Sequence, residues 1–348
     1  MRESVLMVGS VNLDGPEEVF RAVASAVGDR VASIPDGETD ERIEWVSAQE
    51  PVLARLEQLE NVGEEGVGAD GEYRRFSKFR IRDGVAADDI DFGSLGYAEH
   101  AGASYSLFSR LRDEGLIPAG VRFQVSIPTP LAIIFAYVDA RDQLAIETPY
   151  ERQMLAEIRA LAASIPHDDL AIQWDVAVEM AMIEGVFPTY VEGDLLTGLL
   201  ERLTRLGGAV PQDVALGYHL CYGNAGNVHW KEPADTANLV AVANGIAAQA
   251  TRHADWLHLP VPIERDDAAY FEPLRDLRLD PRTRLFLGLV HKEDGVEGAK
   301  RRIAAARTSV ADFGVGTECG MGREPREAVP GLIALHADVA RELDSEAT

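Results

Sequence analysis

Cysteine, positive charge and long apolar runs are all scarce in this sequence. Two cysteines among 348 residues are too few for a disulfide framework, so we expect buried thiols or metal ligands. Lysine and arginine number 33 against 58 aspartates and glutamates, a formal net charge of −25, and such a surface repels nucleic acid and anionic lipid. No apolar run reaches membrane-spanning length, and a strand-like segment follows the first residues without a secretory signal. We therefore expect a cytoplasmic protein with neither nucleic acid nor a membrane as partner.

Short apolar runs alternate with helical patterns along the chain. Eight runs predict strands, at residues 5–8, 31–34, 121–126, 170–175, 214–221, 256–259, 284–290 and 311–316. Because helical patterns separate most of them, we expect the strands to be parallel. Eight such units predict an α/β fold, a (β/α)8 TIM barrel formed by residues 1–348 as a single domain. The alternative, a doubly wound open sheet, is disfavoured because no Gly-x-Gly-x-x-Gly follows the first strand.

Residues 61–95 break this alternation after the second strand–helix unit. They are rich in glycine and acids, and they include a strand-like patch with a basic cluster of Arg74, Arg75, Lys78, Arg80 and Arg82. We expect an insertion that extends over one end of the domain. The basic cluster has two open interpretations, a solvated ribbon balanced by nearby acids or an anion-binding surface.

The stretch 216–224 starts as an apolar strand and ends in small and polar residues. Side chains alternate along a strand, so His219 and Cys221 project to the same side. The other cysteine, Cys319, lies in a second strand-to-glycine turn. Because zinc accepts nitrogen and sulfur ligands, we predict that these three side chains meet and hold one Zn2+ ion. A His-x-Cys pair alone also fits two unrelated half-buried residues, and it is the second cysteine that favours the metal.

Further polar residues follow the other predicted strands. Active sites of barrels lie at the carboxyl ends of the strands, and those ends carry Ser10, Glu38, Asp175, His258 and His291. Each has a structural alternative: Ser10 fits a turn cap, Glu38 and Asp175 fit caps of the following helices, and His258 fits a strand residue satisfied by its neighbours. The combination, more than any single residue, predicts an active site at this rim.

The residue types at these strand ends, and their order along the chain, resemble those of the catalytic domain of cobalamin-independent methionine synthase. That family belongs to a superfamily of (β/α)8 barrels with uroporphyrinogen decarboxylase and epoxyalkane:coenzyme M transferase. The resemblance covers nearly the whole chain. It rests on His219-Leu220-Cys221 and Cys319-Gly320 for the zinc motif, and on Gly9-Ser10, Gly37-Glu38, Ile172-Gln173-Trp174-Asp175 and His291 for the other segments.

The resemblance implies a function and a role for each matched residue. It implies that Ser10, Glu38 and Asp175 bind the backbone of an amino-acid thiol, and that His291 handles a proton, so that Asp175 and His291 are the catalytic pair. Together with the zinc ligands, these roles imply a zinc-dependent methyl or alkyl transferase. Its partners would be a small-molecule thiol and an alkyl donor. Neither the donor, folate or a corrinoid, nor the oligomeric state follows from the sequence.

Two departures from the family pattern keep other functions open. Pro260 stands where the family has its fourth zinc ligand, a glutamate; Glu264, His258, water or substrate are the possible substitutes. The Asp-Glu-Pro after the fourth strand is replaced by the run 175–178, Asp-Val-Ala-Val, which argues against homocysteine itself as the substrate. One alternative is therefore a related demethylase, lyase or decarboxylase with an altered or absent zinc site. The other is a small-molecule binder without catalysis.

Overall fold

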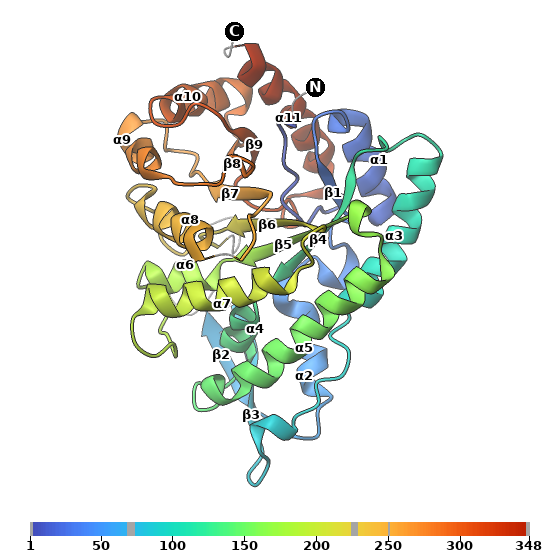
Figure 1. Ribbon diagram of the computed structural model, residues 1–348, viewed down its shortest axis with the longest axis vertical. Coiled ribbons are helices and arrows are strands. Elements are labelled where there is room, and N and C mark those ends of the chain that lie inside the picture. The colour runs from blue at the N-terminus through green and yellow to red at the C-terminus, as the bar shows by residue number, and fades with distance from the viewer. Residues whose placement is uncertain (1–2, 68–73, 224–228, 250, 346–348) are drawn as a thin grey trace.

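A curled parallel sheet forms the centre of the molecule, and helices surround it (Figure 1). The computed structural model describes residues 3–67, 74–223, 229–249 and 251–345. Within these residues seven strands form the sheet, in the order β1-β4-β5-β6-β7-β8-β9. They are β1 (Ser33–Pro35), β4 (Arg122–Pro128), β5 (Leu170–Val176), β6 (Ala215–Leu220), β7 (Trp256–Pro260), β8 (Arg284–Val290) and β9 (Gly314–Thr317). All six pairings are parallel, so the architecture is the predicted α/β class.

Most of the longer helices bury one face, whereas α4 (Pro130–Tyr137) and α6 (Val178–Ile183) are buried almost all round. The first helix along the chain is typical, because it has proline in its first turn with Glu17 and Glu18, and it buries Val19, Phe20 and Val23 at helical spacing. The described helices are α1 (Pro16–Val27), α2 (Glu50–Ala54), α3 (Tyr97–Asp113), α4 (Pro130–Tyr137), α5 (Gln143–Ser164), α6 (Val178–Ile183), α7 (Leu195–Ala209), α8 (Ala237–Gln249), α9 (Ala268–Phe271), α10 (Gly295–Arg307) and α11 (Val329–Ser345). In the described part of the chain, none of them has both the length and the apolar character needed to cross a bilayer.

The described residues do not form the predicted closed barrel of eight strands, because the first apolar run is not a strand. Residues 5–8 form no strand; Val5 instead makes single parallel bridges, one to Val31 beside β1 and one to Val315 in β9. The backbone N–H of Leu6 also donates to the carbonyl oxygen of Val315 at 2.9 Å. Pairing stays this limited because β1 and β9 have only three and four residues. The first run therefore lies between the two edge strands of the curled sheet without extending the ladder.

Two further strands form a separate antiparallel sheet. It pairs β2 (Leu59–Val67) with β3 (Arg74–Ile81), and in Figure 1 it lies beside α4, away from the parallel sheet. Three of its basic side chains are paired with acids: Arg75 with Glu64 at 3.2 Å, Lys78 with Glu65 at 3.4 Å and Arg80 with Glu60 at 2.7 Å. Of the two interpretations of the basic cluster, these pairs favour a ribbon whose charges are balanced by nearby acids and not an anion-binding surface. That residues 61–95 are an insertion stays a prediction.

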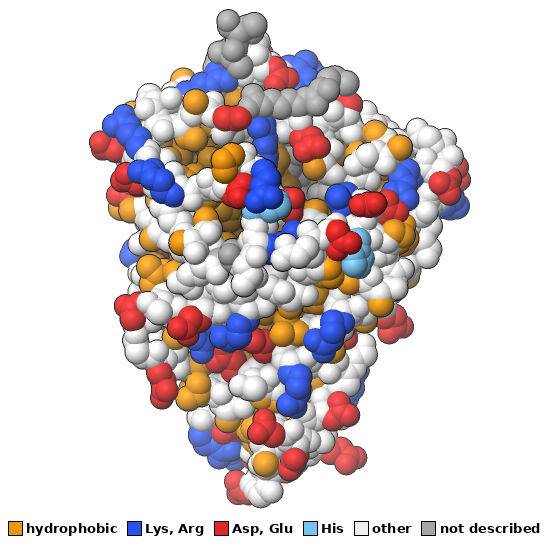
Figure 2. Space-filling model, in the orientation of Figure 1, with side chains coloured by type: hydrophobic (Ala, Val, Ile, Leu, Met, Phe, Trp, Pro, Cys, Tyr) orange, Lys and Arg blue, Asp and Glu red, His pale blue; other side chains and the backbone are white. Residues whose placement is uncertain are grey.

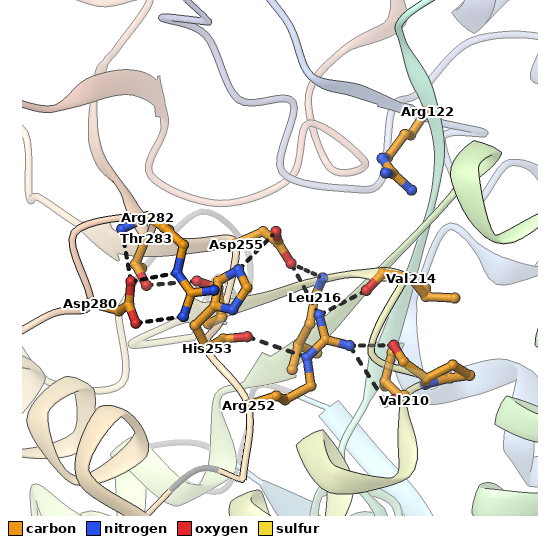
Figure 3. Close-up of polar contacts among 12 residues, drawn as sticks. Arg122, Val210, Val214, Leu216, Arg252, His253, Asp255, Asp280, Arg282 and Thr283 are labelled. Atoms are coloured by element: carbon orange, nitrogen blue, oxygen red, sulfur yellow. Dashed lines mark hydrogen bonds and ion pairs between the residues drawn. The ribbon is translucent and has the colours of Figure 1, made fainter.

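A buried arginine anchors the start of β6. The guanidinium of Arg252, in the loop before β7, donates to the carbonyl oxygen of Val214 at 2.8 Å (Figure 3). It also contacts the carboxylate of Asp255 at 3.2 Å, and that carboxylate accepts from the backbone N–H of Leu216 at 2.8 Å. Because a buried guanidinium requires several acceptors, this network ties the loops before β6 and β7 together and supports the register of both strands.

Charge is spread over the outside of the molecule. On the face shown in Figure 2, acidic and basic side chains are intermixed, and no basic patch stands out.

Candidate metal centre

Three neighbouring strands bring the predicted site residues to one edge of the sheet. In the register of β5, β6 and β7, His219 pairs with Asp175 on one side and with His258 on the other. Cys221 follows the end of β6, and Cys319 lies two residues beyond the end of β9. The carboxyl ends of parallel strands share one edge, so these side chains are placed on the same rim by the topology alone. Asn224, the last residue of the predicted stretch, lies outside the described residues.

The predicted convergence of His219, Cys221 and Cys319 is confirmed. One ligand atom from each lies within 4.8 Å of the others, and among the described residues no other group of three or more His, Cys, Asp or Glu side chains has this geometry. The two sulfur atoms are 3.6 Å apart. Side chains at these separations can reach a common ion with small rearrangements, because zinc–sulfur and zinc–nitrogen bonds are about 2.0–2.3 Å long. That the group binds zinc stays a prediction.

The imidazole of His219 has one nitrogen engaged and one available. Its Nδ1 lies 2.7 Å from Nδ1 of His258, and at that distance one of the two atoms carries the shared proton. Its buried Nε2 has no hydrogen-bond partner among the described residues. A buried polar atom without a partner is costly and calls for an explanation. A metal ion on Nε2 would supply it, so the donor set fits zinc.

The two thiols are in direct contact with each other. The Cys221 thiol donates to the sulfur of Cys319, and this contact, with a further contribution from His219, holds the pKa of Cys319 well below its usual range. The same contact and burial raise the pKa of Cys221. Of the two sulfur atoms, that of Cys319 therefore loses its proton more readily. A zinc ion would require both thiols to be deprotonated, as ligand thiols generally are.

A fourth protein ligand is absent from the described group. His258 contacts the engaged nitrogen of His219 and does not belong to the group, and Glu264 does not belong to it either. Pro260 closes β7 within the sheet. Neither of the two protein substitutes considered for the missing glutamate thus lies with the three candidate ligands in this arrangement. A three-ligand centre leaves one coordination position for substrate or water, as in catalytic zinc sites.

A cavity of about 90 Å3 lies over the three candidate ligands, and the predicted substrate-binding residues line it. Ser10, Glu38 and Asp175 face the same cavity as His219, Cys221 and Cys319. The capping alternative fails for two of them, because the N-caps of the helical turns that follow are Thr39 and Ala177. Ser10 packs closely on the turn after Cys319: a Cβ on Gly320 would lie 2.4 Å from its Oγ. Glycine after Cys319 is therefore required by this contact.

Glu38 has an unusual backbone and an unusual carboxyl. Its φ of 49° is left-handed, a conformation disfavoured for non-glycine residues, and Gly37 before it has φ 82°. Its side chain lies against Gly9, where a Cβ would be 3.0 Å from the Oε1 atom. Burial, and then the charge of Asp36, raise the pKa of Glu38 to about 8. The carboxyl is therefore protonated at neutral pH and can donate a hydrogen bond or a proton into the cavity.

His291 is placed differently from the expectation. It lines a second cavity of about 450 Å3, which also contains Glu264 and which shares Cys319 and Gly320 with the first. Its Nε2 lies 2.9 Å from the carbonyl oxygen of Val261, and burial lowers its pKa. A neutral imidazole with its Nε2–H donated to a carbonyl keeps Nδ1 as an acceptor. Its role in proton transfer stays a prediction.

Other functional residues were missed by the sequence analysis. Arg323 lines the first cavity, where its charge contributes to the low pKa of Cys319 and opposes the rise in the pKa of Glu38. Glu318 pairs with His229 at 2.9 Å. The contacts of Arg323 with Glu38 and of Glu318 with His229 join residues far apart along the chain, and the sequence holds no signal for them.

Comparison with known proteins shows which molecules share this fold. No family model and no curated protein matches the sequence. The structure is similar to a B12-independent methionine synthase from Shewanella sp. W3-18-1 in complex with selenomethionine, with a TM-score of 0.61, 14% identity, and coverage of 99% of this chain and 98% of that one. It is also similar to a protein named as a vitamin-B12 independent methionine synthase from Listeria monocytogenes, with a TM-score of 0.56, 14% identity, and coverage of 94% and 86%. At this identity the similarity shows that the chain shares the fold of these proteins over nearly its whole length.

Proposed function

We propose that the protein is a zinc-dependent methyl or alkyl transferase whose acceptor is a small thiol. The observation that carries the proposal is the convergence of His219, Cys221 and Cys319, one ligand atom each, within 4.8 Å beneath a cavity. The fold shared with two B12-independent methionine synthases supports it. We also propose that the curled sheet and the Val5 segment between its edges together represent a (β/α)8 barrel of one domain.

The candidate ligands suit a thiol-activating ion. Nε2 of His219 and the sulfur atoms of Cys221 and Cys319 would hold it, and two thiolates with a neutral imidazole balance the charge of Zn2+. Bound zinc would supply the Lewis acidity that keeps an acceptor thiol deprotonated at neutral pH. Transfer forms a bond between the acceptor sulfur and the alkyl carbon. It breaks the bond from that carbon to the donor, whose leaving atom takes the electron pair and a proton.

The remaining cavity residues orient the substrate and handle protons. Ser10 and Asp175 would bind its polar end, and the protonated carboxyl of Glu38 can donate to it. His291, neutral and in the adjoining cavity, would return the proton to the leaving group. Residues that line the cavity would hold acceptor and donor in line, and alignment of this kind supplies much of the rate of a two-substrate reaction.

Metal analysis of freshly purified protein tests the proposal. We expect one zinc ion per chain in the wild type and its loss in Cys221→Ser and in Cys319→Ser. Ser10→Ala is the matched control, because it changes a side chain in the same cavity that is not a candidate ligand. Protein that transfers an alkyl group to a thiol while repeatedly free of metal would overturn the proposal.

A second candidate keeps the cavity and changes the reaction to that of a demethylase, lyase or decarboxylase. It is favoured by Pro260 in β7, where the fourth ligand would come from, and by the absence of a carboxylate from the described group. A panel of methoxy, thioether and thiol compounds separates the two candidates. Only the transferase requires a thiol acceptor for turnover, so turnover of a methoxy or thioether compound without any thiol would support the second candidate.

A further inference from the structure

One wall of the first cavity is aromatic, and the proposed reaction does not use it. Besides the polar residues at the strand ends, the lining includes Phe76 from β3, Phe135 from α4, and Phe187 and Trp230 from connecting segments. These four residues come from parts of the chain that are far apart in sequence. The fold therefore assembles them beside the candidate metal centre.

The aromatic wall is continuous and begins next to the candidate ligands. A Cβ on Gly223, two residues after Cys221, would lie 2.5 Å from the ring of Trp230, so that ring covers the turn after Cys221. The Trp230 ring contacts Phe187, with centroids 4.8 Å apart, and Phe187 stacks on Phe135 at 4.6 Å with 22° between the ring planes. The wall thus runs from the sulfur ligands to α4.

The wall also contains an unsatisfied donor. The indole Nε1 of Trp230 is buried and has no hydrogen-bond partner among the described residues. Tryptophan side chains normally place this N–H against an acceptor when buried. An occupant of the cavity with an acceptor atom beside its ring would satisfy it.

The start of α6 adds to the apolar character of the cavity. Ala177 and Val178, the second and third residues after Asp175, line it with apolar side chains. This part of the lining therefore offers a substrate apolar contact. Ligand sites combine a largely apolar lining with a few convergent polar groups, and here the polar groups come from the strand ends and from Glu44 and Arg323.

We propose that the substrate held in this cavity carries an aromatic ring, packed against Phe135, Phe187 and Trp230, with its reacting end at the candidate metal centre. This inference rests on the proposed function for the identity of the reacting end. A flat ring matches the stacked wall, because aromatic groups prefer offset-stacked and edge-to-face contacts with one another. Homocysteine, which has no ring, would leave the wall uncovered.

Binding measurements on the purified wild-type protein, whose zinc content is determined in parallel, test the inference. We compare phenylmethanethiol, methoxybenzene and homocysteine by isothermal titration calorimetry, so that the two ring compounds distinguish a ring on the acceptor from a ring on the donor. We expect at least one ring compound to bind ten times more tightly than homocysteine. If homocysteine binds as tightly as both ring compounds, or if neither ring compound binds, the inference is wrong.

A matched pair of variants localises the effect. Phe187→Leu keeps an apolar side chain but removes the stack, and we expect it to weaken ring binding at least tenfold while homocysteine affinity stays the same. Phe271→Leu, at a fully buried ring of α9 that does not line the cavity, is the control and should leave both affinities unchanged. Equal weakening of all compounds in Phe187→Leu would contradict the inference.

Zinc content separates this inference from the proposed function. Phe187→Leu should retain zinc, because no candidate ligand is changed. If the wild type binds ring compounds selectively but contains no zinc, the proposed function fails and the aromatic site stands. If it contains zinc but shows no preference for a ring, the inference of an aromatic substrate fails and the proposed function stands.

Discussion

His258 offers a sharp test of how the candidate ligand His219 is held. It is fully buried in β7, its Nδ1 lies 2.7 Å from Nδ1 of His219, and the ring centroids are 4.8 Å apart. Binding of zinc through Nε2 of His219 requires that its Nδ1 carry the proton. His258 is then the acceptor that selects this tautomer and orients the ring. We predict that His258→Leu weakens zinc binding.

The size of the effect follows from the contact that is lost. Leucine cannot accept a hydrogen bond, so the buried N–H of His219 would lose its partner, at a cost of about 1–3 kcal/mol. Loss of partners behind metal ligands typically lowers metal affinity about 10- to 100-fold, which corresponds to about 1.4–2.7 kcal/mol. The two ranges agree, so we expect the dissociation constant for zinc to rise by a factor in this range.

Competition with a chromophoric chelator measures the affinity, and two further variants control the measurement. His258→Asn places an amide oxygen near the position of Nδ1 and should restore most of the affinity. His336→Leu removes another fully buried imidazole, in α11, whose Nδ1 lies 2.7 Å from the carbonyl oxygen of Leu332, and should leave zinc affinity unchanged. The reasoning is refuted if folded His258→Leu binds zinc as tightly as the wild type, or if asparagine and leucine behave alike.

Two other predictions concern stability. Burial raises the pKa of Glu179 from 4.5 to about 7, so the native protein binds a proton that the unfolded chain has released, and stability falls as pH rises across this interval, by about 3 kcal/mol. Urea unfolding at a series of pH values should show that Glu179→Gln loses this part of the slope; an unchanged slope would contradict the assignment. A Cβ on Gly217 would lie 1.8 Å from the ring of Trp256, so Gly217→Ala should destabilise the protein by about 1–3 kcal/mol in urea unfolding. Gly331→Ala, in α11 with no atom within 4 Å of the added Cβ, should not; equal losses in both would show that the clash is not the cause.

The sequence predicted the strands of the parallel sheet well and the closure of the barrel poorly. Apolar runs marked β4 to β9 to within a few residues, because a strand buried on both faces is apolar along its length. The run 5–8 has the same composition, yet it forms only bridges from Val5 to Val31 and Val315. Whether the run pairs as a strand depends on the length and position of its neighbours in space, β1 and β9. Both are distant from at least part of the run's local sequence pattern, which contains no information about them.

At the candidate site, the chemistry of the side chains was visible in the sequence and their partners were not. Alternation along β6 places His219 and Cys221 on one face whatever surrounds them, and the parallel order of strands places both at the same rim as Cys319. The contact of His219 with His258 follows from the register of β6 with β7. The sequence had suggested His258 as a metal ligand or a simple strand residue, and neither describes its contact with Nδ1 of His219.

The sequence alone thus determined three features: the residue types, their alternation along each strand, and the order in which the strand ends follow one another. These features depend only on covalent order and local backbone geometry. Only the tertiary structure decided that two sulfur atoms 98 residues apart lie 3.6 Å from each other, that the half-buried Glu38 lines the same cavity, and that an aromatic wall from four segments adjoins them. These features require the sheet to curl and the loops at its carboxyl edge to pack together. Burial and distance in three dimensions, not position along the chain, set the pKa values and the shape of the cavity.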